Sequence, residues 1–160
     1  MKPVRTFTDQ LAKGTAAEQT LDGWARNRFG AEPRPADMDD QRRGIDRHIE
    51  APDGTTYTLE YKADGQGHRS GKAFIESISV DRTGKPGWLW TSQADYVVYW
   101  LSGDGRGWVI TPANLQARAW DWTRRFPVKV SSNPSYHSYG ILVPHTELDL
   151  AASETFVWKD

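Results

Sequence analysis

One hairpin signal constrains the fold of this chain more than any other feature. Two segments of alternating apolar and polar residues, 44–50 and 55–62, flank the turn sequence Ala-Pro-Asp-Gly. Pro52 and Asp53 suit a type I turn, and Gly54 suits the left-handed position that follows such a turn. We therefore predict two antiparallel strands in which Ala51 pairs with Thr55.

The rest of the pattern predicts two helices and further strands. A helix is expected over 15–29, because Thr15 and Glu18 have the spacing of a capping box and Gly30 can terminate the helix. A second helix is expected from Thr111, its N-cap, to about Arg125. Further strands are expected over 73–80, 95–101 and 108–110. This order predicts one domain over 1–160, of the α/β (α+β) class, with a single mixed β-sheet flanked by helices.

Composition narrows the class of protein. The 160 residues carry a net charge of −1, and none of them is cysteine. Disulfides and thiolate metal sites are thereby excluded. A protein that coats nucleic acid without specificity is usually basic overall, so any contact with a polyanion must come from a local patch. The first residues lack the apolar core of a signal peptide and no apolar run could span a bilayer, so we expect a soluble, cytoplasmic protein.

The predicted hairpin brings two acids together. Counting back from the turn, Asp46 falls opposite Glu60, and directly opposed side chains have Cβ atoms about 4.5–5.5 Å apart. Lys62 shares a sheet face with Glu60, because residues i and i+2 of a strand point the same way. A divalent cation such as Mg²⁺ can join the two carboxylates, with the Tyr61 carbonyl as a third oxygen ligand. The alternative is a solvated ion-pair cluster that contributes little.

The order Asp46, hairpin, Glu60-Tyr61-Lys62, preceded by a helix that carries Glu18, resembles the PD-(D/E)XK nuclease superfamily. The segments "GKAFIES" (71–77) and "GWLWTSQADYVVYW" (87–100) resemble small phage and bacterial members that are similar to Holliday-junction resolvases. The resemblance covers residues 14–101. Asp46 departs from the family pattern in following isoleucine rather than proline.

The resemblance implies a restriction-endonuclease-like core and Mg²⁺-dependent hydrolysis of DNA by a metal-activated water, leaving a 5′-phosphate and a 3′-hydroxyl. Mn²⁺ is expected to substitute for Mg²⁺. The resemblance assigns the metal to Asp46 and Glu60 and the catalytic lysine role to Lys62. It also implies cytoplasmic action in a host cell if the gene belongs to a phage.

Several further residues have two interpretations. Glu18 is, as the resemblance implies, an acid that reaches a metal-bound water, or it is the capping-box partner of Thr15, and the two roles do not exclude each other. Glu76 is either a site residue or an acid at the edge of the sheet, and His48 lines the site if it points with Asp46. The glycine-rich loop 65–72 either is solvated or contacts phosphates, through accessible backbone N–H groups and through side chains. Those side chains are His68, Arg69 and Lys72.

The function that we expect is that of a metal-dependent deoxyribonuclease with DNA as its partner; a homodimer is left open. No phosphate-binding loop or dinucleotide motif is present, so no nucleotide cofactor is expected. One rival function is a catalytically inactive nucleic-acid-binding or partner-recognition module on the same fold. Another is an interaction protein with exposed rings at Trp88, Trp90, Trp120 and Trp122.

Overall fold

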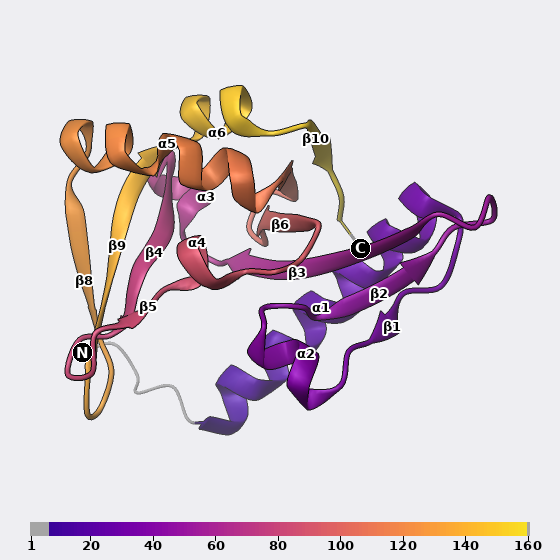
Figure 1. The fold of residues 1–160 in the computed structure, drawn as a ribbon, viewed down its shortest axis with the longest axis horizontal. Coiled ribbons are helices and arrows are strands. Elements are labelled where there is room, and N and C mark those ends of the chain that lie inside the picture. The colour runs from indigo at the N-terminus through magenta and orange to yellow at the C-terminus, as the bar shows by residue number, and fades with distance from the viewer. Residues whose placement is uncertain (1–6, 160) are drawn as a thin grey trace.

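The computed structural model describes residues 7–159, which form two β-sheets packed with helices (Figure 1). The helices are α1 (Phe7–Phe29), α2 (Met38–Arg42), α3 (Gly67–Ser70), α4 (Trp88–Thr91), α5 (Pro112–Arg125) and α6 (His145–Ala151). The first sheet contains, in spatial order, β1 (Arg34–Pro35), β2 (Arg47–Glu50), β3 (Thr56–Asp64), β6 (Tyr96–Leu101), β7 (Arg106–Ile110) and β10 (Glu154–Val157). The second contains β5 (Lys85–Pro86), β4 (Lys72–Val80), β9 (His137–Pro144) and β8 (Val128–Ser132).

The α+β class with a mixed sheet is confirmed, since β3 pairs with β6 in parallel and the other strands of that sheet pair antiparallel. The expectation of a single sheet is wrong, because the strand predicted over 73–80 belongs to the second sheet. Both edges of β3 are already occupied, by β2 and β6. The strand β4 instead pairs with β9, and each residue pair between them joins positions more than sixty apart in sequence, from Ile78–Tyr139 to Lys72–Pro144.

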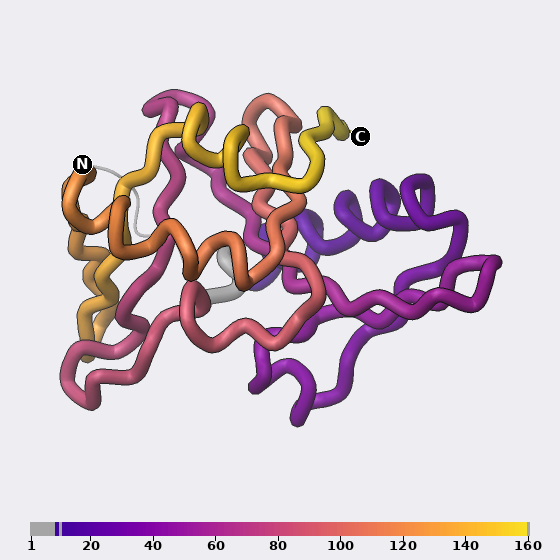
Figure 2. The backbone as a smooth tube through the Cα atoms, turned by 45° about the horizontal axis from the view of Figure 1, so that its top comes forward, coloured from indigo at the N-terminus to yellow at the C-terminus, as the bar shows by residue number. Residues whose placement is uncertain are grey.

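Two apolar clusters lie on opposite faces of the six-stranded sheet. One joins α1 to Leu59, Tyr61 and Val98, and the Trp24 ring stacks on Phe156 with centroids 4.4 Å apart. The other combines buried residues of both sheets with residues of α4, α5 and α6. The two sheets therefore share one core, and Figure 2 shows α1 and the β2–β3 hairpin at the far end of the molecule from β8 and β9.

The capping box predicted at Thr15 is wrong. Helix α1 begins at Phe7 among the described residues, so Thr15 lies inside it, and its hydroxyl donates to the Leu11 carbonyl at 3.0 Å. Glu18 is consequently not a capping residue. The second predicted helix is confirmed: the Thr111 side chain accepts the Asn114 N–H, and α5 extends from Pro112 to Arg125.

The C-terminal third contains elements that the sequence pattern did not resolve. Sequence analysis did not predict α6, whose residues Leu148 and Ala151 are buried in the larger core. No helix of the described residues 7–159 is long and apolar enough to cross a bilayer.

Candidate active site

Strand β3 places the candidate site residues on two faces of the sheet. Leu59 and Tyr61 point towards α1, whereas Glu60 and Lys62 point to the opposite face. Glu60 is only 5% exposed, and its Oε1 lies 3.0 Å from the Lys62 ammonium. The Lys62 Nζ also lies 5.6 Å from the centre of the Trp88 ring of α4. The predicted sharing of one face by Glu60 and Lys62 therefore holds in the structure.

The predicted hairpin register also holds. The Ala51 N–H donates to the Thr55 carbonyl at 2.8 Å, Gly54 has a φ of 86°, and the ladder continues back to the pair Arg47–Leu59. Extended by one residue, this register would bring Asp46 opposite Glu60, a pair that the ladder itself does not include.

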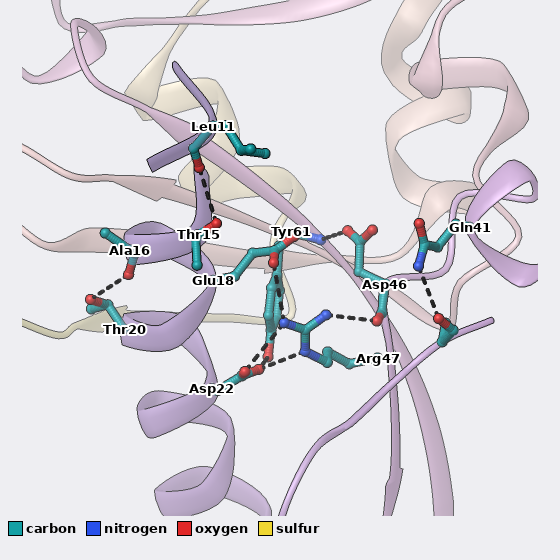
Figure 3. Close-up of polar contacts among 11 residues, drawn as sticks. Leu11, Thr15, Ala16, Glu18, Thr20, Asp22, Gln41, Asp46, Arg47 and Tyr61 are labelled. Atoms are coloured by element: carbon teal, nitrogen blue, oxygen red, sulfur yellow. Dashed lines mark hydrogen bonds and ion pairs between the residues drawn. The ribbon is translucent and has the colours of Figure 1, made fainter. Parts of the chain in front are cut away.

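The ladder between β2 and β3 ends at the pair Arg47–Leu59. Beyond it, the Asp46 side chain, rather than a backbone carbonyl of β2, accepts the next N–H of β3. The Asp46 N–H donates to the Leu59 carbonyl at 2.8 Å, and Asp46 Oδ2 accepts the Tyr61 N–H at 2.7 Å (Figure 3). The backbone groups of Leu59 and Tyr61 face the same edge of β3, because they alternate along the strand. The Tyr61 carbonyl therefore points to the edge that β2 has left, beside the Asp46 carboxylate.

Glu60 is in an unfavourable position for a charged group. Burial raises the pKa of the Glu60 carboxyl above its ordinary value, and the nearby Asp46 carboxylate adds to the rise. The Lys62 ammonium and the Ser92 hydroxyl act in the opposite direction on this pKa. The Ser92 hydroxyl donates to the Gly44 carbonyl at 3.4 Å, and Glu60 Oε2 is buried without a hydrogen-bond partner. Buried polar atoms in proteins almost always have partners, so this oxygen requires an explanation.

Gly44 closes the site from the side of α2. Its φ is 75°, and a Cβ atom on it would lie 3.0 Å from Glu60 Oε2 and 2.9 Å from the Ser92 Cα. Only glycine combines this backbone conformation with such a close approach. The Gln93 N–H donates to the Arg43 carbonyl at 2.8 Å, which ties the end of α4 to the same loop.

The donor set fits a hard divalent cation. Glu60 Oε2, the Asp46 carboxylate and the Tyr61 carbonyl are all oxygen donors, and Mg²⁺ is typically bound through one or two carboxylates with water completing the coordination. No group of three or more His, Asp or Glu side chains gathers as a metal site within the described residues. Any ion held here would therefore rely on two carboxylates, with backbone or water as further ligands.

A network on the α1 side of the sheet was missed by sequence reasoning. Arg47 is 8% exposed; its Nε donates to Asp22 Oδ1 at 2.8 Å and its Nη1 to the Asp46 carbonyl at 2.9 Å (Figure 3). The Tyr61 hydroxyl also donates to Asp22 Oδ1, at 3.0 Å. The sequence did contain a signal for this network. Arg47 and buried Ile49 are two residues apart on β2 and point to the same face, so Arg47 needed an acidic partner from the helix that covers this face.

Glu18 belongs to this network. Its Oε2 lies 3.4 Å from Arg47 Nη2, and 47% of its side chain is exposed. It also lines a cavity of about 220 Å³ together with Leu21, Tyr61 and Ala63. The structure therefore places Glu18 beside the backbone that carries Asp46 and Tyr61, in contact with Arg47.

Two other candidates are held by neighbours outside the Glu60–Lys62 pair. The Nε2 atom of His48 lies 2.7 Å from Asp40 Oδ2, within α2. Glu76 is half-buried on β4, where it pairs with Gly140 in the second sheet.

The loop 65–72 is more ordered than the sequence suggested. Asp64 Oδ1 accepts the N–H groups of Gln66 and Gly67, and the Gly71 N–H donates to the Gly67 carbonyl. The expectation that the N–H groups of Gly67 and Gly71 are accessible is therefore wrong, since the Asp64 carboxylate accepts the first and the Gly67 carbonyl accepts the second. His68 packs on Gly103, in the turn between β6 and β7, and its Nδ1 is buried without a partner.

Arg69 and Lys72 are the two exposed cations of the segment 65–72.

No protein-family profile, curated protein or solved structure matches this chain.

Proposed function

We propose that this protein is a metal-dependent DNA endonuclease that hydrolyses phosphodiester bonds. The observation that carries the proposal is the buried Glu60 carboxylate, with one oxygen on the Lys62 ammonium and the other without a partner. A carboxylate with a purely structural role is expected to have both oxygens hydrogen-bonded. The neighbouring Asp46 carboxylate makes the position still less favourable for a negative charge unless a cation joins the two.

Asp46, Glu60 and the Tyr61 carbonyl are the groups that would hold Mg²⁺ or, as a substitute, Mn²⁺. When bound, such an ion supplies Lewis-acid polarisation of a phosphate and activation of water near neutral pH. The resemblance to PD-(D/E)XK nucleases in the order Asp46, Glu60, Lys62 supports the same assignment.

The residues of the chain itself have distinct tasks in this proposal. The Lys62 ammonium lies beside Glu60 and would stabilise the negative charge that develops on the scissile phosphate. The Trp88 ring and Glu60 Oε1 restrict where that ammonium lies. Arg47 is a positioning residue, because it fixes the Asp46 backbone while Asp22 and Glu18 hold the guanidinium. Burial raises the pKa of the Tyr61 hydroxyl, which therefore remains protonated and donates to Asp22.

Cleavage assays test the proposal. Linear, nicked, flapped and four-way-junction DNA are incubated with the protein and Mg²⁺, Mn²⁺ or Ca²⁺, and the ends of the products are mapped. We expect cleavage with Mg²⁺ and Mn²⁺, 5′-phosphate ends, and little hydrolysis with Ca²⁺, which is larger and looser in its coordination geometry.

Variants assign the activity to the site. Asp46→Asn and Glu60→Gln should abolish cleavage. The matched control is Lys129→Ala, which removes an exposed lysine from β8 in the other sheet and should cleave as the wild type does. DNA binding without cleavage under every metal condition would favour the rival function, an inactive recognition module on the same fold.

A further inference from the structure

Two tryptophans are exposed on the face of the molecule that carries α4 and α5. Of the eight tryptophans in the chain, Trp24, Trp100, Trp108 and Trp122 are at most 5% exposed. Trp120 is 70% exposed and Trp90 is 38% exposed, and their ring centres lie 6.1 Å apart with the planes inclined by 49°. Exposing two adjacent indoles forgoes the burial that stabilises the other rings.

The position of this tryptophan pair is fixed by the framework. Gln116 lies one helical turn before Trp120 on α5, and its Nε2 donates to the Leu89 carbonyl at 3.2 Å. Leu89 itself is fully buried, so α4 is attached to the core directly beneath the pair. The two rings therefore form a preset surface, since neither helix needs to move to present them.

The same short helix connects the pair to the candidate active site. Trp88 of α4 faces the Lys62 ammonium, and Trp90 is only two residues further along. Residues two apart on a helix do not share a face, so a strand whose phosphate lies near Lys62 would have to cross α4 for its next bases to reach Trp90 and Trp120. Arg124, one helical turn after Trp120, is exposed and has no ion pair among the residues that the structure describes.

We propose that Trp90 and Trp120 form a stacking platform for unpaired bases, so that the preferred substrate presents a single-stranded segment next to the cleaved bond. This inference rests on the proposed nuclease function for its substrate class. Aromatic rings flanked by cations are the usual means of holding single strands, because every base has a face that stacks and every phosphate a charge. A duplex keeps its bases stacked on each other and cannot use the platform.

Binding of short single-stranded and double-stranded oligonucleotides in EDTA tests the platform without cleavage. Trp120→Ala should weaken single-strand affinity about 5- to 150-fold, which corresponds to the loss of one stacked base. Duplex affinity should change little, and Trp120→Phe, which keeps a ring, should restore most of the single-strand affinity. Leu150→Ala is the matched control, because it removes a similarly exposed apolar side chain (68%) from α6.

The outcomes separate this inference from the nuclease proposal. Equal single-strand affinity of Trp120→Ala and the wild type overturns the platform, even if the wild type cleaves DNA. A selective loss of single-strand affinity supports the platform, even if no substrate is cleaved. A Trp120→Ala protein that instead shifts from dimer to monomer in sedimentation overturns the platform as well, because the rings would then be covered by a second copy of the chain.

Discussion

Replacing Glu60 by glutamine distinguishes a metal ligand from a structural ion pair. The substitution keeps the shape of the side chain and removes the charge. It forfeits the pair with Lys62, whose side chain is 31% exposed and can return to water. A partly exposed pair contributes at most about 1 kcal/mol, whereas a buried carboxylate costs more than the neutral amide that replaces it, because burial disfavours the charged form. In EDTA we therefore expect the free energy of unfolding to stay the same or to rise by about 1 kcal/mol, a melting shift of about 2–4 °C.

Magnesium should affect the two proteins differently. At a free Mg²⁺ concentration 100 times its Kd, binding to the folded state stabilises the wild type by about 2.7 kcal/mol. For a chain of this size, that corresponds to a rise in Tm of about 5–11 °C. Glu60→Gln should show almost none of this rise. Glu154→Gln is the control, because it removes a carboxylate from an ion pair with Arg28 on the opposite side of the sheet and should keep the response to Mg²⁺.

The pH dependence gives an independent check. The pKa of Glu60 is raised above its ordinary value of 4.5 by burial, so the folded state binds more protons than the unfolded state between these two pKa values. In EDTA, the Glu60 contribution to stability should therefore fall as pH rises through that window and be constant above it. The gain from Mg²⁺ should grow over the same window, because the ion needs the carboxylate. A Glu60→Gln protein that loses several kcal/mol in EDTA, beside a wild type that does not respond to Mg²⁺, would refute this reasoning.

Three further predictions address other parts of the site. Gly44→Ala should lose more than the about 1–2 kcal/mol of its left-handed backbone, because the new Cβ would lie 2.9 Å from the Ser92 Cα, and it should also lose its Mg²⁺-dependent rise in Tm. Gly84→Ala, at a φ of 68° with open space around it, should lose only the backbone cost. Lys62→Ala should cleave far more slowly and still bind Mg²⁺ by calorimetry, because the role proposed for the lysine lies mainly in the transition state; cleavage at the wild-type rate would remove it from the proposed mechanism. Replacing Arg69 and Lys72 together by alanine should weaken binding to all DNA sequences alike and reduce the slope of log affinity against log salt by about two, while an unchanged slope would mean a merely solvated segment.

Local chemistry made part of the fold predictable. The Pro52-Asp53-Gly54 turn determined the register of β2 and β3, and Thr111 marked the start of α5, because both signals act within a few residues. The same kind of local signal misled at Thr15, whose capping-box spacing occurs inside a longer helix. The pairing of β4 with β9 could not be read from the sequence, since it depends on which strand edges remain free after the rest of the sheet has formed.

The candidate site was predictable to a similar extent. Register alone brought Asp46 next to Glu60, and alternation brought Lys62 to the same face. Neither could show that the Asp46 carboxylate would bond the Tyr61 N–H, because that requires β2 to leave the ladder at one particular residue. The role of Arg47 was missed although its partners Asp22 and Glu18 lie within the helix predicted over 15–29, since the face of that helix that meets the sheet depends on tertiary packing.

The bond from the Tyr61 N–H to Asp46 has a practical consequence for trapping a substrate. An alanine at position 46 would remove the acceptor and leave the amide of Tyr61, in a buried strand, without a partner. Asparagine keeps one carbonyl oxygen for that amide while it removes the charge that a cation needs. To test the proposed nuclease with uncleaved DNA, the protein should therefore carry Asp46→Asn, which removes the charge of the proposed metal ligand and keeps an acceptor for the Tyr61 N–H.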